Sequence, residues 1–132
     1  MNDTTTPAGP VTHVVLVGHC GLDSPVLGSW AKQLLPDTEI ARVNRQAELG
    51  DYLNGRSLLL INRVLEGRFD HPTSLKMIET FAAQDDPPRM MLVSNYPDAQ
   101  AEAVAAGAQP GVGKSELNTA EAGQRLLDAA AE

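Results

Sequence analysis

One run of apolar residues near the middle of the chain constrains the fold more than any other feature. Residues 57–62 read Ser-Leu-Leu-Leu-Ile-Asn, and a polar, glycine-containing loop follows them as far as Asp70. Such a run, with polar residues at both ends, is typical of a strand that is buried on both faces of a parallel sheet. Open α/β sheets carry their functional groups at the carboxyl ends of their strands. Asn62, the last residue of the run, therefore holds the most informative position in the sequence.

Strand-like and helix-like segments alternate along the chain. The predicted strands cover residues 12–19, 39–44, 57–62 and 90–93, with a weak fifth strand around Val112. The predicted helices begin at an N-cap Ser24, at Arg45, at Pro72, at Pro97 and at an N-cap Asn118, and the second of them runs to Leu53. Five strand–helix repeats predict an α/β fold, with a parallel sheet covered by helices on both faces.

Length and charge fit one domain and restrict its partners. A chain of 132 residues with 42% hydrophobic residues can bury a single core. Its net charge of -7 argues against a nucleic-acid surface, which needs a basic patch. We interpret residues 1–11, which are polar and contain two prolines, as a flexible leader, and residues 12–132 as the folded domain.

The remaining composition favours a cytoplasmic protein that does not bind membranes. No stretch is long and apolar enough to cross a bilayer, and the first residues lack the charged and apolar regions of a signal peptide. The single cysteine, Cys20, cannot form an intrachain disulfide, which fits a reducing compartment.

The order and spacing of several residues resemble the receiver domains of response regulators, over roughly residues 12 to 130. The matching positions are Asn62, Leu65, Gly67 and Asp70 in and after the third strand, Ser94 after the fourth, the run 105–108, and Lys114. The resemblance implies a flavodoxin-like, doubly wound five-stranded parallel sheet with strand order 2-1-3-4-5. It also implies a place in signal transduction, where receiver domains accept a phosphoryl group in a phosphorelay.

The chain departs from the family pattern at the positions that carry phosphorylation. Asn62 stands where the family has its phosphoacceptor aspartate, and an amide cannot form an acyl phosphate. Gly18 and His19 replace the acidic pair that holds Mg²⁺ in the family, although this cation prefers oxygen ligands. Gly111 replaces the aromatic switch residue, and Ser115 replaces the proline after the lysine.

These departures indicate a pseudo-receiver that works without phosphorylation. Its degenerate pocket would comprise Gly18, His19, Asn62, Ser94 and Lys114. We expect no catalytic residue, no enzymatic activity and no cofactor, and we expect the partner to be a protein, including a second copy of the chain. With the family's acids missing, we expect Lys114 to point only loosely towards Asn62, and the peptide bond between Lys114 and Ser115 to be trans.

A second hypothesis is a sensor of a small ligand or metal in the remodelled pocket. His19, Cys20 and Asp23 follow the first predicted strand, and His71 is able to approach from a neighbouring loop. The spacing of these residues is not diagnostic of a metal site. We therefore favour the alternative, in which His19 and Cys20 fill the space left by the acids and Asp23 supports the start of the next helix.

Two further patterns have both a functional and a structural interpretation. Residues 108–115 loosely match a phosphate-binding Walker A loop, but the match lacks the strand before it and the room for a second nucleotide motif after it. The alanine-rich helix from Pro97 to Ala106 fits a flat docking face and close helix–sheet packing equally well.

Overall fold

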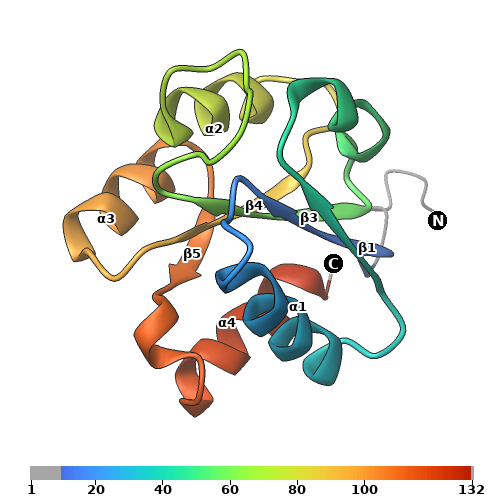
Figure 1. Cartoon of the computed structure of the whole chain (residues 1–132), viewed down its shortest axis with the longest axis vertical. Helices are drawn as coiled ribbons and strands as arrows, with labels where there is room; N and C mark the ends of the chain where they lie inside the picture. The colour runs from blue at the N-terminus through green and yellow to red at the C-terminus, as the bar shows by residue number, and fades with distance from the viewer. Residues whose placement is uncertain (1–9, 132) are drawn as a thin grey trace, which may run out of the picture.

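The apolar run forms the central strand of a parallel sheet, as predicted. The computed structural model describes residues 10–131, in which β3 (Ser57–Asn62) pairs with β1 (His13–Val17) on one side and with β4 (Arg89–Val93) on the other. The edge strands are β2 (Glu39–Val43) and β5 (Gln109–Val112). The strand order β2-β1-β3-β4-β5 confirms the predicted topology (Figure 1).

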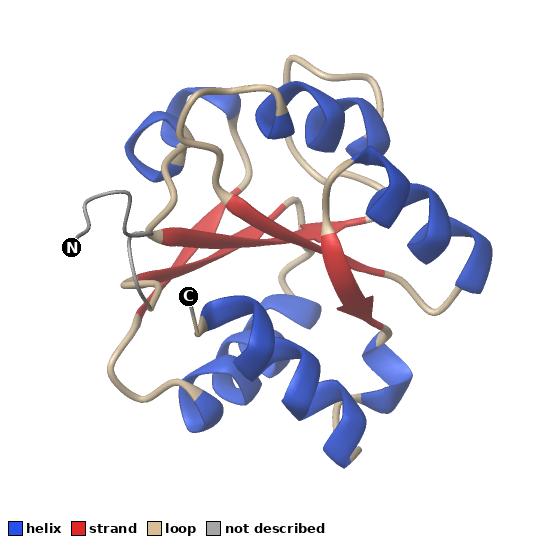
Figure 2. Ribbon diagram, turned by 180° about the vertical axis from the view of Figure 1, so that it is seen from behind, coloured by secondary structure: helices blue, strands red, loops and turns tan. Residues whose placement is uncertain are grey.

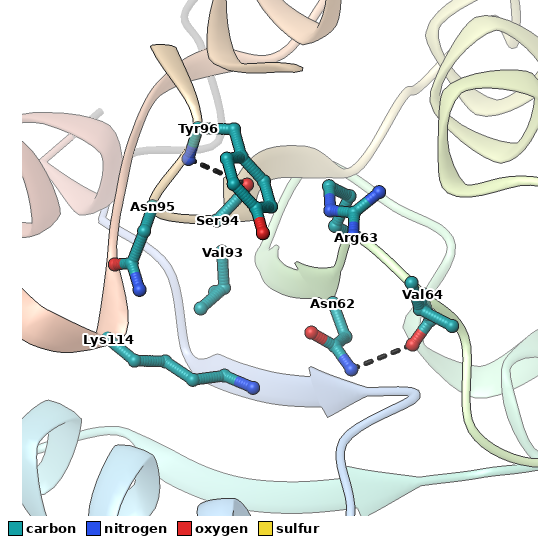
Figure 3. Close-up of a pocket in the computed structure, with 8 residues that line it drawn as sticks. All are labelled: Asn62, Arg63, Val64, Val93, Ser94, Asn95, Tyr96 and Lys114. Carbon is teal, nitrogen blue, oxygen red and sulfur yellow. Dashed lines mark hydrogen bonds between the residues drawn. The ribbon is translucent and has the colours of Figure 1, made fainter. Parts of the chain in front are cut away.

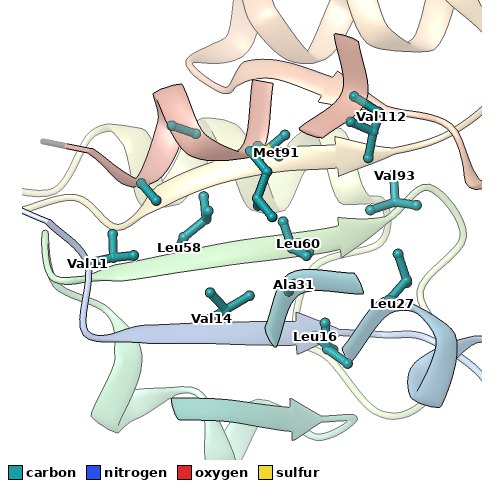
Figure 4. Close-up of a cluster of buried hydrophobic side chains, with 14 residues drawn as sticks. Val11, Val14, Leu16, Leu27, Ala31, Leu58, Leu60, Met91, Val93 and Val112 are labelled. Atoms are coloured by element: carbon teal, nitrogen blue, oxygen red, sulfur yellow. The ribbon is translucent and has the colours of Figure 1, made fainter. Parts of the chain in front are cut away.

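Alternate residues of the central strands enter two separate cores, one on each face of the sheet. Leu58 and Leu60 of β3 belong to one core, together with Val14 and Leu16 of β1 (Figure 4). Leu59 and Ile61 of β3 enter the other core. This division explains why the run is apolar at every position rather than at every second one.

Two helices cover each face of the sheet (Figures 1 and 2). On one side lie α1 (Asp23–Leu34) and α4 (Ala120–Ala130), and on the other lie α2 (Ser74–Ala82) and α3 (Pro97–Ala106). In α3, Ala103 is buried in the core, which is the close packing that small residues permit.

Two predicted N-caps are wrong by one or two residues. The side chain of Thr119, not that of Asn118, accepts a hydrogen bond from the amide of Ala122 and caps α4. Helix α1 begins at Asp23 without a side-chain cap, and the Ser24 hydroxyl instead donates to the carbonyl of Cys20. Adjacent polar residues have similar capping preferences, so sequence alone did not distinguish between them.

The helix predicted from Arg45 to Leu53 is also wrong. This segment forms two short 3-10 helices, η1 (Gln46–Glu48) and η2 (Gly50–Tyr52), separated by the fully buried Leu49. Gly50 lowers the helical propensity in the middle of the segment, and Tyr52 and Leu53 pack only partly buried against the core beside Leu49.

The predicted leader lies mostly outside the described residues. The packed part of the chain includes Val11, which is buried and donates its backbone N–H to the carbonyl of Ala130, one residue before the predicted boundary at Thr12. Within residues 10–131, no helix has the length and apolarity to span a membrane.

Gly67→Ala should strongly destabilise the protein. Gly67 has φ +116°, a conformation that L residues rarely adopt, and an added Cβ would overlap the backbone carbonyl of Asn44. We expect the free energy of unfolding, measured in urea, to fall by about 2 kcal/mol or more. Gly50→Ala is the matched control, because nothing lies within 4 Å of its added Cβ. Equal stability of the two variants would show that the loop after β3 does not pack against β2 as described.

Candidate functional site

The carboxyl ends of β3, β4 and β5 surround a hollow of about 400 Å³ (Figure 3). It is lined by Asn62, Arg63, Val64, Val93, Ser94, Asn95, Tyr96 and Lys114. Three of the five residues predicted for the degenerate pocket, Asn62, Ser94 and Lys114, therefore meet here. Gly18 and His19 do not line the hollow.

The side chain of Asn62 links the carboxyl ends of β1 and β3. Its amide nitrogen donates to the carbonyl of Gly18 at 3.0 Å and to the carbonyl of Val64 at 2.7 Å. Both bonds require hydrogens on the side chain, which an ionised carboxylate does not have. This position is therefore built for an amide.

Gly18 and His19 lie outside the lining of the hollow for two different structural reasons. Gly18 has φ +76°, and an added Cβ would lie 2.8 Å from Cδ2 and 3.1 Å from Cα of Leu65. The His19 side chain is fully buried, with Nε2 2.8 Å from the carbonyl oxygen of Leu60. Because this oxygen can only accept, neutral His19 carries its proton on Nε2.

Burial holds His19 in its neutral form. Loss of solvent lowers the pKa of His19 from 6.5 to about 4, and the positive charge of Lys114 acts in the same direction. The hydrogen bond to Leu60 opposes this shift without cancelling it. His19 is thus an uncharged core residue at neutral pH.

Lys114 is held by an acid, which corrects the expectation that it points loosely towards Asn62. Its ammonium lies 2.6 Å from Oδ2 of Asp23, in a salt bridge whose side chains are 34% and 37% exposed. This bond is the largest cause that lowers the pKa of Asp23. The second is a hydrogen bond from the Cys20 thiol at 3.4 Å. Helix α1 thus supplies a partner for Lys114 from a residue outside the family's acidic pair.

The residues proposed for a metal or ligand are only partly brought together. Cys20 contacts Asp23, but His19 turns to Leu60 in the core, and His71 packs edge-on against Phe81 with ring centroids 5.3 Å apart. Among the residues that the structure describes, no three His, Cys, Asp or Glu side chains are arranged to hold a metal ion.

The Walker A interpretation of residues 108–115 is wrong. Half of the segment is strand β5, and Lys114 begins the 3-10 helix η3 (Lys114–Glu116). The amides that would cradle phosphate are occupied, since Gly113 donates to Glu116 at 2.7 Å and Ser115 donates to Asn95 at 3.2 Å. The peptide bond between Lys114 and Ser115 is trans, as predicted.

The sequence analysis missed Gln100, which fixes the ends of β4 and β5. Its side-chain nitrogen donates to the carbonyls of Leu92, Ser94 and Val112 at 3.0, 3.0 and 3.3 Å. An added Cβ at Gly111 would overlap the Leu92 carbonyl and lie 2.5 Å from Oε1 of Gln100. An aromatic residue therefore has no room at position 111.

The sequence analysis also missed the pairing of Arg63 with Tyr96. The guanidinium carbon lies 4.9 Å from the centroid of the Tyr96 ring, and both residues line the hollow. The amide of Tyr96 donates to the Ser94 hydroxyl oxygen at 3.1 Å, which orders the turn after β4. An arginine and an aromatic residue separated by one helix and one strand give no recognisable sequence signal.

Acid should destabilise the protein through His19. The pKa of His19 is about 4 in the folded protein and 6.5 in the unfolded chain. The stability that this difference contributes is fully present above pH 6.5. It is lost as the pH falls from 6.5 to the folded pKa of about 4. We expect this histidine to remove about 2 kcal/mol of unfolding free energy between about pH 7.5 and about pH 5.

The measurement is urea unfolding across this range for the unmodified protein, for His19→Gln and for the control His13→Gln. His19→Gln should lose most of the pH dependence, and the control should keep it. A pH dependence unchanged in His19→Gln would mean that His19 is not buried in its neutral form.

Solved structures with a similar fold are receiver domains. A DNA-binding response regulator of the LuxR family from Staphylococcus aureus aligns with a TM-score of 0.68 at 13% identity, covering 91% of this chain and 99% of that one. The signal receiver domain of a DNA-binding response regulator from Colwellia psychrerythraea 34H aligns with a TM-score of 0.64 at 12% identity, covering 88% and 95%. Another response regulator from Colwellia psychrerythraea aligns with a TM-score of 0.61 at 16% identity, covering 91% of this chain and 97% of that one.

No protein-family model matches the chain, and no curated protein matches it. At such low identities the likeness concerns the fold rather than the activity. The strand order, the helices on both faces and these neighbours agree that this chain has the fold of a response-regulator receiver domain.

Proposed function

We propose that this chain is a phosphorylation-independent pseudo-receiver, a signalling module that acts by binding another protein. The observation that carries the proposal is the Asn62 amide, which donates to the carbonyls of Gly18 and Val64. At this position a phosphoacceptor would need a free carboxylate oxygen directed at its substrate. The chain has instead an amide whose nitrogen is engaged on both sides.

The surroundings of Asn62 support the absence of a magnesium-dependent reaction. Mg²⁺ needs several oxygen ligands in near-octahedral geometry. Gly18 has no space for a side chain against Leu65, and His19 is turned into the core. Asp23, the acid that contacts Lys114 at this edge, is engaged in that salt bridge.

A protein partner fits the surface better than a nucleic acid does. The net charge of -7 repels a phosphate backbone, and a module without its own chemistry has to act through contacts. We include a second copy of the chain among the candidate partners, and sedimentation velocity at increasing protein concentration distinguishes self-association from a monomer.

Asn62→Asp should not create a working phosphoacceptor. Phosphoryl transfer depends on positioning and on neutralising charge at the transferring oxygens, and this site offers Lys114 but no acid at positions 18 and 19 to hold Mg²⁺. We expect no phosphoryl adduct by intact-mass spectrometry after incubation with acetyl phosphate and Mg²⁺, under conditions that modify a receiver domain with an intact aspartate. A stoichiometric adduct on the variant would contradict the proposal.

The same substitution should destabilise the fold. A carboxylate at position 62 would face the carbonyl oxygens of Gly18 and Val64, so two hydrogen bonds would be replaced by repulsion. We expect the free energy of unfolding to fall by about 1–3 kcal/mol at neutral pH. Asn118→Asp, which adds the same charge at an exposed position, is the control and should change it little.

A further inference from the structure

We propose that the hollow at the carboxyl edge of the sheet binds a small organic anion without a covalent bond, with Arg63 and Lys114 contacting its oxyanion group and Tyr96 covering its apolar part. The inference goes beyond the proposed function, because a pseudo-receiver that binds a protein needs no small ligand. It would make the module responsive to a metabolite rather than to phosphorylation.

The charge of the hollow is opposite in sign to that of the chain. The protein carries a net charge of -7, but the eight lining residues include Arg63 and Lys114 and neither Asp nor Glu. Asp23, outside the lining, pairs with Lys114, so the hollow keeps one uncompensated positive charge, which favours an anionic occupant.

Arg63 contributes the uncompensated charge. None of the acidic side chains that the structure describes forms a salt bridge with it, and its guanidinium carbon lies over the Tyr96 ring, 4.9 Å from the centroid. This cation–π contact needs no hydrogen bond from the N–H groups of Arg63 to an oxygen, so they remain available to a ligand. Those groups are the ones that bind an oxyanion in a bidentate manner.

The hollow carries further donors besides Arg63. Lys114 reaches in from the end of β5, while Arg63 and Tyr96 lie across from it (Figure 3). Its ammonium has three hydrogens, of which Asp23 engages one. The Ser94 hydroxyl accepts from the Tyr96 amide and keeps its own hydrogen to donate.

The size and the walls of the hollow indicate an organic anion rather than a bare ion. Its volume of about 400 Å³ lies within the usual range for small-molecule sites, and a single phosphate group would leave most of it unfilled. The Tyr96 ring with Val64 and Val93 provides apolar surface next to the two cations. A ligand with one ring or a short chain and one oxyanion group matches this combination.

Isothermal titration calorimetry of the full chain with four probes tests the proposal. The probes are phenyl phosphate, benzoate, inorganic phosphate and phenol. We expect saturable binding of phenyl phosphate or benzoate. Inorganic phosphate, which lacks the apolar ring, and phenol, which lacks the oxyanion group, should bind more weakly. Binding of both organic anions supports any oxyanion group, and binding of phenyl phosphate alone supports a phosphate ester.

Arg63→Gln should weaken binding of the organic anion by about tenfold or more, because a charge-assisted bidentate contact is lost. Arg56→Gln removes an exposed arginine at the other end of β3 and should leave the affinity unchanged. Both variants should match the unmodified protein in thermal unfolding. Amide chemical shifts on titration should change at residues 62–64 and 94–96.

Three results would overturn the inference. They are the absence of binding by either organic anion, binding of phenol as tight as that of phenyl phosphate, and equal affinities of Arg63→Gln and Arg56→Gln. None of them would affect the pseudo-receiver proposal, which depends on Asn62 and not on a ligand.

Discussion

The two hydrogen bonds donated by Asn62 determine what the carboxyl edge of this sheet can do. They join the end of β3 to the end of β1 through Gly18 and to the following loop through Val64. An amide satisfies these carbonyl oxygens, and a carboxylate would be repelled by them. In the proposed function, the residue at the position of the phosphoacceptor of receiver domains is therefore also a structural clamp, which would link the absence of phosphorylation to the stability of the site.

The neighbouring substitutions are consistent with that clamp. Gly18 takes a positive φ and packs against Leu65, so an acid there would disturb the loop that Asn62 holds. His19 uses the adjacent position to fill the core, where burial keeps it neutral. Lys114, which no longer has a phosphoryl group to contact in the proposed function, pairs with Asp23. In the proposed function, His19 and Lys114 thus have partners other than phosphate or Mg²⁺.

Sequence patterns predicted the strands, and the resemblance to receiver domains predicted the sheet order and the meeting of Asn62, Ser94 and Lys114 at the strand ends. They did not predict the Lys114–Asp23 salt bridge, which joins residues 91 positions apart and depends on where α1 begins. Gln100 was missed because a glutamine in a helix gives no sign of whether it faces solvent or carbonyl groups.

Short elements were the other source of error. The segment from Arg45 to Leu53 forms 3-10 helices around Leu49, its one fully buried residue, and helical propensity alone does not predict this packing. Arg63 and Tyr96 approach one another only because β3 and β4 are neighbours and the chain turns outwards after each. Contacts of this kind follow from loop conformation, and the periodicity of apolar residues does not predict them.

The side-chain amide of Asn62 can be observed directly by nuclear magnetic resonance while Mg²⁺ is titrated into the unmodified protein. The account predicts amide protons that exchange slowly with water, because the nitrogen is held by two carbonyl groups, and chemical shifts that do not move with Mg²⁺. Rapid exchange together with saturable shifts on adding Mg²⁺ would show an open, metal-binding edge and would contradict the central claim.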